Sequence, residues 1–192
     1  MMARMPASRR RPIAHHIVPY LFIAAVILLC IAGFAFHNWL NPTPPATIAG
    51  KAWVIDGDTV SITNTHIRLE GIDAPESDQT CLDAAGKNWP CGQNATRALR
   101  RLIAGRELSC AERSKDRYGR LLAVCRLPDG VEINAWMVRE GWALASGFVK
   151  LYEAEETEAT AAKRGIWAGT FTKPWHWRDQ HPRQWGGKKT DD

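Results

Sequence analysis

The residues that could do chemistry are concentrated in the ten residues from Ile67 to Glu76, IRLEGIDAPE. This stretch holds Arg68 and three carboxylates, of which Asp73 and Glu76 stand beside apolar side chains that we expect to be buried. Like charges against a hydrophobic core are destabilising unless a cation or a hydrogen-bond donor compensates them. The stretch therefore indicates a site that binds positive charge.

Two further short segments extend this set. IDGDT, residues 55–59, contributes Asp58, and DRYGR, residues 116–120, contributes Arg120. Carboxylate oxygens suit a hard cation, Ca²⁺ or Mg²⁺, rather than zinc, and guanidinium groups match the oxygens of a phosphate. A metal, two arginines and a spare carboxylate are the equipment for phosphodiester hydrolysis.

Each segment alone also has an ordinary structural interpretation. Two acids around Gly57 are typical of a turn, Arg68 and Glu70 fit the exposed face of a strand, and DRYGR fits a hairpin. Glu70 is interpreted as a surface residue. The order and spacing of the three segments in one chain favour the catalytic interpretation.

In order, the motifs ID-GDT, RL-x5-PE with its Asp, and D-[KR]-YGR resemble those of the staphylococcal (micrococcal) nuclease family, also called thermonucleases. The match runs from about Lys51 to Gly169. The resemblance implies an α+β fold, a five-stranded OB-fold β-barrel with three helices. It also implies an enzyme, a Ca²⁺-dependent endo/exonuclease that hydrolyses DNA and RNA phosphodiesters, prefers single strands and leaves 3′-phosphate ends.

The resemblance implies a ligand set for the cation. By position, Asp58 and Asp73 correspond to the carboxylates that bind Ca²⁺, and Ala74 corresponds to a residue that contributes its backbone carbonyl. The best-known member has threonine in place of Ala74. Because only the carbonyl is expected to bind, this difference should matter little.

The resemblance also implies catalytic and substrate-binding residues. Glu76 is expected to orient and deprotonate the attacking water. Arg68 and Arg120 are expected to neutralise the phosphate as it becomes five-coordinate, and Arg120 to assist the leaving oxygen. Arg117 and Tyr118 are expected to bind the substrate near its 5′ end.

One part of the family pattern is missing. A tyrosine pair that follows the second helix in the family is replaced by Gly147 and Val149, which removes rings on which bases stack. Two rival functions stay open: a catalytically inactive nuclease-like module that binds nucleic acid or protein, and an envelope scaffold that uses the Trp-rich C-terminal region. The first rival predicts losses among the five carboxylates and arginines, and none is lost.

Hydrophobic periodicity predicts the elements that position these residues. Period-2 alternation indicates strands in residues 51–71, and residues 73–90 are expected to form a long loop. Apolar residues at helical spacing predict helices in residues 91–106 and 134–142. In residues 151–165 the acids come early and Lys163 and Arg164 come last before Gly165, which matches the helix dipole and predicts a third helix.

The N-terminal region predicts a membrane anchor. Residues 17–36 are an uncharged, apolar run, about 30 Å long as a helix, which matches the hydrocarbon thickness of a bilayer. Arg9–Arg11 precede it and, by the positive-inside rule, keep residues 1–16 in the cytoplasm. We therefore expect a single-pass protein of the bacterial inner membrane with a periplasmic catalytic domain. A cleaved signal peptide is the alternative, although no convincing small-x-small cleavage site follows the run.

The remaining chain divides into three expected parts. Residues 37–50 are Pro-rich and predict a linker, residues 51–170 the nuclease-like domain, and residues 171–192 a Trp-rich extension and tail. The tryptophans of this extension stand among basic residues, but packing against the barrel is the favoured interpretation. The net charge of +5 comes mostly from four arginines in the first fifty residues, so it does not indicate nucleic-acid binding. No protein partner is implied, and a monomer is expected.

The cysteines agree with export. Apart from Cys30 in the apolar run there are four, and an even number in an exported domain suggests two disulfides. If a hairpin turns in the middle of DRYG, Cys110 lies opposite Cys125. That pairing leaves Cys81 and Cys91 to close the long loop. Four unpaired thiols are the alternative, and the spacing disfavours a zinc site.

Overall fold

The computed structural model describes residues 17–41, 45–147 and 151–182 of the chain. Contacts between residues divide the chain into two compact units, Met1–Pro44 and Pro45–Asp192.

The first unit contains the helix α1 (Ile17–Leu40). Within the described residues, one span, Phe22–Leu40, is long and apolar enough to cross a membrane, with a mean hydropathy of 2.0, and a signal sequence would have the same character. The helix continues four residues beyond the expected end at Phe36, because the first residue that disfavours helix is Asn41, which precedes a proline. The basic tail of residues 1–16 lies outside the described residues.

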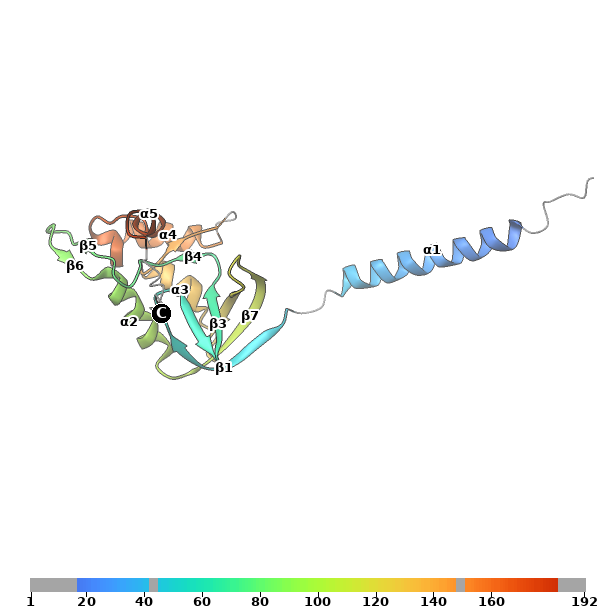
Figure 1. The fold of residues 1–192 in the computed structure, drawn as a ribbon, viewed down its shortest axis with the longest axis horizontal. Coiled ribbons are helices and arrows are strands. Elements are labelled where there is room, and N and C mark those ends of the chain that lie inside the picture. The colour runs from blue at the N-terminus through green and yellow to red at the C-terminus, as the bar shows by residue number, and fades with distance from the viewer. Residues whose placement is uncertain (1–16, 42–44, 148–150, 183–192) are drawn as a thin grey trace, which may run out of the picture. The chain divides into compact units, whose positions relative to one another are not determined.

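The second unit is a barrel with helices around it (Figure 1). Its described strands are β1 (Thr47–Val54), β2 (Thr59–Ile62), β3 (Thr65–Leu69), β4 (Ile72–Asp73), β5 (Cys81–Leu82), β6 (Asn88–Trp89), β7 (Glu107–Lys115), β8 (Leu121–Arg126) and β9 (Leu144–Ala145). Its described helices are α2 (Cys91–Ile103), α3 (Ile133–Arg139), α4 (Glu153–Ala161), the 3₁₀ helix η2 (Gly165–Ala168) and α5 (Pro174–Gln180).

Five of these strands close the barrel in the order β1-β2-β3-β8-β7. The apolar residues of the period-2 pattern, such as Val60, Ile62, Ile67 and Leu69, are fully buried in its core. Neighbouring strands are antiparallel except β3 and β8, which are parallel. The predicted five-stranded OB-fold barrel of the α+β class is confirmed.

The three predicted helices correspond to α2, α3 and α4. The apolar stripe of α2 is buried against the core through Ala95, Leu99 and Ile103. Helix α3 is shorter than expected because Gly141 adopts a φ of +70°. A Cβ on Gly141 would lie 2.2 Å from the carbonyl oxygen of Arg164, so the close packing of that segment requires glycine.

Two expectations about irregular segments were wrong. Residues 47–50, expected in the linker, form the first half of β1 and pair with residues 108–111 of β7. The hydrogen bonds of this pairing close the barrel, which a local composition rule cannot detect. The expected long loop of residues 73–90 contains the short hairpin β5–β6, with Cys81 opposite Trp89.

Both predicted disulfides, Cys81–Cys91 and Cys110–Cys125, are formed. The hairpin loop holds three residues rather than two and ends at Gly119, whose φ is +79°. A bulge in β7 between Glu112 and Ser114 offsets this extra residue, so Cys110 still faces Cys125. In the chain-entropy model each disulfide stabilises the fold by about 3 kcal/mol.

Candidate active site

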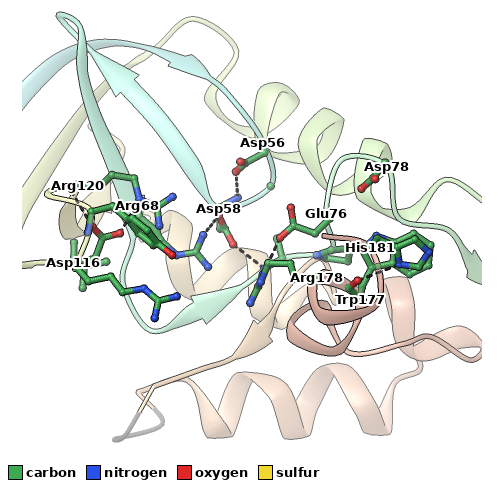
Figure 2. A pocket seen from close by; sticks show the side chains of 16 residues that line it. Asp56, Asp58, Arg68, Glu76, Asp78, Asp116, Arg120, Trp177, Arg178 and His181 are labelled. Carbon is green, nitrogen blue, oxygen red and sulfur yellow. Dashed lines mark hydrogen bonds and ion pairs between the residues drawn. The ribbon is translucent and has the colours of Figure 1, made fainter. Parts of the chain in front are cut away.

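A cavity of about 730 Å³ brings the predicted residues together (Figure 2). Seven of the eight residues that the sequence singled out for catalysis, metal binding or substrate binding line it: Asp58, Arg68, Ala74, Glu76, Arg117, Tyr118 and Arg120. The eighth, Asp73, is bonded to Arg68 directly beside the cavity. The three motifs therefore converge on one place although they are separate in the chain.

The parallel pairing of β3 with β8 explains part of this convergence. Arg68 lies on β3 opposite Leu122 of β8, and Ile67 lies opposite Leu121. Arg120 immediately precedes β8, so the end of the hairpin loop lies next to the strand that carries Arg68. The barrel thus places two arginines, 52 positions apart in the printed sequence, on the same cavity.

Two glycines allow the carboxylate segments to approach each other. A Cβ on Gly57 would lie 2.7 Å from the Cβ of Ala74, and a Cβ on Gly92 would lie 1.6 Å from the carbonyl oxygen of Glu76. Real Cβ atoms do not tolerate such contacts. The glycine between the two acids of IDGDT is therefore required for close packing as well as for a bend.

Arg68 lies between two buried carboxylates. Its Nη1 donates to Asp58 Oδ1 at 2.7 Å and its Nη2 donates to Asp73 Oδ1 at 2.8 Å. Asp58 also accepts hydrogen bonds from the backbone N–H of Ala74 and the hydroxyl of Thr59. The buried carboxylates of Asp58 and Asp73 are thus compensated by one guanidinium, in line with the positive charge that the sequence indicated.

Burial raises the pKa of Asp58 from 3.8 to about 7, although the neighbouring guanidinium of Arg68 acts to lower it. The folded state therefore holds a proton on Asp58 at pH values where the unfolded chain has released it. Between about pH 4 and pH 7 this carboxyl makes the fold less stable as the pH rises.

We therefore expect Asp58→Asn to gain stability relative to the wild type as the pH rises from about 4 to 7, with no further gain above 7. Asparagine does not titrate, so only the wild type loses stability when the side chain at position 58 ionises. Urea unfolding of both proteins in chelator across this range measures the difference. A difference that shrinks with rising pH contradicts the assigned direction.

A third arginine, which sequence reasoning did not select, contacts the same carboxylates. Arg178 Nη1 donates to Asp73 Oδ1 at 3.0 Å and to Glu76 Oε1 at 2.8 Å, and its Nη2 donates to Asp73 Oδ2 at 3.0 Å. Both oxygens of Asp73 therefore contact guanidinium groups. Arg178 lies on α5, in the Trp-rich extension.

The aromatic and basic composition of the extension was the available signal for Arg178, but packing was the favoured interpretation. Phe171 of the extension does pack, beside Trp167, against a buried cluster that includes Ile166. Trp177, however, lines the cavity together with Arg178 and His181. Packing therefore accounts for only part of the extension.

Gln79 is a second residue that the sequence did not indicate. Only 1% of it is exposed, and its Oε1 accepts a hydrogen bond from the backbone N–H of Glu76 at 3.1 Å. Its Nε2 donates to the carbonyl oxygen of Thr172 at 2.6 Å. Gln79 thus fixes the backbone that carries Glu76 and connects it to the segment before α5.

The hairpin loop holds the other predicted residues. Arg120 Nε donates to Asp116 Oδ2 at 2.7 Å, while Asp116 Oδ1 accepts from the backbone N–H groups of Tyr118 and Arg120. Tyr118 is 69% exposed, and the guanidinium carbon of Arg117 lies 4.9 Å from its ring centre. The loop therefore presents an oriented guanidinium beside an accessible aromatic ring.

The two positions at which the tyrosine pair is missing contribute no described side chain to the cavity. Gly147 is absent from its lining, and Val149 lies outside the described residues.

Glu70 is half-buried rather than exposed, and its Oε2 is buried without a hydrogen-bond partner among the described residues. The expectation of a surface residue at Glu70 was therefore wrong, because β3 ends against the core.

Comparison with known proteins agrees with this fold and site. Residues 66–169 match the family described as staphylococcal nuclease homologue. The chain is 37% identical over 123 residues to the succinoglycan biosynthesis protein ExoI of Rhizobium meliloti (strain 1021), covering 62% of this chain and 64% of that relative. It is 33% identical over 136 residues to an uncharacterized endonuclease of Escherichia coli, covering 65% of this chain and 80% of the relative.

A micrococcal nuclease of Shigella flexneri is 33% identical over 144 residues, with 65% of this chain and 76% of the relative covered. The closed barrel gives the OB-fold, and the family match with the nuclease relatives gives the class, a hydrolase of the nuclease type. The chain belongs to the staphylococcal nuclease family. Asp58 and α5 lie outside the range that matches the family.

Proposed function

We propose that this nuclease is Ca²⁺-dependent, hydrolyses phosphodiester bonds of DNA and RNA with a preference for single strands, and leaves 3′-phosphate ends. The observation that carries the proposal is the convergence of Arg68, Arg120 and Glu76 on one cavity, beside buried carboxylates. Positive charge and a proton acceptor in one place are what phosphodiester hydrolysis requires.

For the cation we propose Asp58, Asp73 and the backbone carbonyl of Ala74 as ligands. Oxygen donors of this kind fit a hard cation, and the guanidinium groups already bonded to both carboxylates support a site that stabilises positive charge. In the described ranges no group of three or more His, Cys, Asp and Glu side chains is already gathered around a metal position. When bound, the cation would polarise a phosphoryl oxygen and lower the pKa of a water molecule.

The chain's own residues perform the remaining steps in this proposal. Glu76 orients the attacking water and accepts its proton, from a backbone position fixed by Gln79. Arg68 and Arg120 bind the phosphate and neutralise the charge that develops as it becomes five-coordinate. The bond to the 5′ oxygen breaks, with Arg120 assisting the leaving group. Arg117 and Tyr118 bind the adjoining nucleotide.

We further propose that α1 anchors the protein in the bacterial inner membrane and that the barrel is periplasmic. The apolar span of α1 and the two disulfides support this location, because disulfides persist in oxidising compartments. In this arrangement the nuclease-like domain begins with β1, and residues 171–192 form the extension.

The test uses the full chain purified in detergent with its disulfides intact. We expect it to cleave single-stranded DNA with Ca²⁺, to be inactive in chelator and much less active with Mg²⁺, and to leave ends that a phosphatase must treat before they can be extended. A folded protein that binds the strand with Ca²⁺ and never cuts it would instead be an inactive binding module.

Arg178 shares one carboxylate, Asp73, with the proposed cation, and a prediction follows from this overlap. We expect Arg178→Gln to bind Ca²⁺ about tenfold more tightly than the wild type, because the guanidinium no longer competes for Asp73. Isothermal titration calorimetry without substrate measures the affinity. Lys173→Gln, which removes an exposed cation just before α5, is the control and should bind as the wild type does. Weaker binding by Arg178→Gln would show that Arg178 supports the carboxylates instead of competing for them.

A further inference from the structure

Helix α5 forms part of the cavity although it lies outside the range that matches the family, which ends at residue 169. Trp177 and Arg178 of α5, and His181 just after it, line the same cavity as Arg68 and Arg120 (Figure 2). Helix α5 therefore forms a wall of the cavity, and this wall lies outside the family match.

The segment before α5 is fixed to the loop that carries Glu76. Thr170 and Leu82 exchange two backbone hydrogen bonds, of 2.9 and 3.1 Å. The buried Gln79 then binds Thr172 through its side chain. Because the same loop is closed by a disulfide, α5 is attached to a constrained part of the fold rather than to a free tail.

The side chain of Arg178 holds α5 against the cavity. Its three hydrogen bonds reach Asp73 and Glu76 across more than 100 residues of sequence. The cavity of about 730 Å³ nevertheless exists with α5 in this position. Helix α5 therefore lines the cavity and does not fill it.

This wall carries a pair of stacked rings. The rings of Trp177 and His181 lie with their centres 3.9 Å apart and their planes 18° from parallel, and His181 is exposed. Figure 2 shows this pair and Arg120 on opposite sides of the group that includes Arg68, Asp58 and Arg178. A phosphate held by the arginines would therefore have the ring pair on one side and the hairpin loop on the other.

We propose that the Trp177–His181 pair is a base-stacking subsite for the nucleotide next to the reacting phosphate. The proposal rests on the proposed function, since that function places the phosphate at the arginines. Aromatic rings beside positive charge are the general means of holding single-stranded nucleic acid, and stacking tolerates any base because every base has a π face. The subsite would accordingly bind single strands without strong sequence preference.

The chain supplies a matched control on the same helix. Trp175 belongs to α5 but is absent from the cavity lining, and its ring contacts Lys173 instead, 5.1 Å from the ammonium nitrogen. Its removal takes away an exposed tryptophan of the same short helix and leaves the proposed subsite intact.

The experiment measures binding of two fluorescein-labelled ten-nucleotide strands to the full chain in detergent, in chelator so that no strand is cut. One strand is oligothymidylate and the other carries abasic sites throughout. We expect the wild type to bind oligothymidylate more tightly than the abasic strand. The double variant Trp177→Ala with His181→Ala should bind oligothymidylate about tenfold more weakly and lose most of the preference for bases, since the exposed ring of Tyr118 remains.

Two further variants separate stacking from loss of the helix. Trp177→Phe with His181→Phe restores two rings and should restore the preference, while Trp175→Ala should bind as the wild type does. If Trp175→Ala loses as much affinity as the double alanine variant, or if the double variant binds more tightly, the subsite is absent. Cleavage by the wild type with Ca²⁺ is assayed in parallel: cutting without a base preference overturns only the subsite, and a base preference without cutting overturns only the proposed nuclease mechanism.

Discussion

Replacing Arg120 by alanine is expected to lower kcat by about 10³–10⁵ while leaving the free energy of unfolding nearly unchanged. The guanidinium would no longer neutralise the five-coordinate phosphate or assist the leaving oxygen. The change in the free energy of unfolding is small because the ion pair joins Arg120 to Asp116, four positions earlier, at a partly exposed place. Such pairs contribute little to stability.

Single-turnover cleavage with Ca²⁺ and urea unfolding together test this prediction. Arg113→Ala is the matched control, because Arg113 is an exposed cation on the same hairpin and does not line the cavity. Equal losses of activity in the two variants would indicate a general charge effect. A large fall in stability of Arg120→Ala would assign Arg120 to the fold rather than to the reaction.

Glu76→Gln is the second substitution with a large expected effect, a decrease in kcat of about 10²–10⁴. Glutamine retains the shape of the side chain and can still contact Arg178, but it cannot accept a proton from water. Binding of a single strand should be unchanged or tighter, because one negative charge next to the phosphate is removed. The predicted signature is therefore a loss of turnover without a loss of affinity.

Asp78 provides the control for this substitution, since it lines the same cavity and is exposed. We expect Asp78→Asn to change kcat by less than about threefold, on the order of an ordinary surface substitution. Single-turnover rates at saturating strand and fluorescence anisotropy in chelator measure the two quantities. If Asp78→Asn loses as much turnover as Glu76→Gln, the rate depends on the overall electrostatic field of the cavity and not on a proton acceptor at Glu76.

The barrel was predictable because its strands repeat a local pattern. Val60, Ile62 and Ile67 alternate with polar residues, and this alternation alone selects the face that enters the core. The start of β1 was not predictable in the same way. Residues 47–50 follow a Pro-rich stretch, and only their pairing with β7, about sixty residues later, makes them a strand.

The pairing of two cysteines across the hairpin was predictable, whereas the length of the hairpin loop was not. The position of DRYG placed Cys110 opposite Cys125, as the structure has them. The loop is one residue longer than expected, and a bulge in β7 restores the register. Two local deviations offset each other, which sequence spacing cannot reveal.

The sequence by itself determined the residues that could do chemistry, because Asp58, Arg68, Glu76 and Arg120 lie in short motifs whose chemical types and order are informative. Only the tertiary structure decided what surrounds them. Arg178 reaches Asp73 from 105 positions away, and no local pattern encodes a contact that depends on how the chain returns to the barrel. The reason is physical: carboxylates buried against a core bind whichever cation the fold brings within hydrogen-bond distance, and that distance is set by packing.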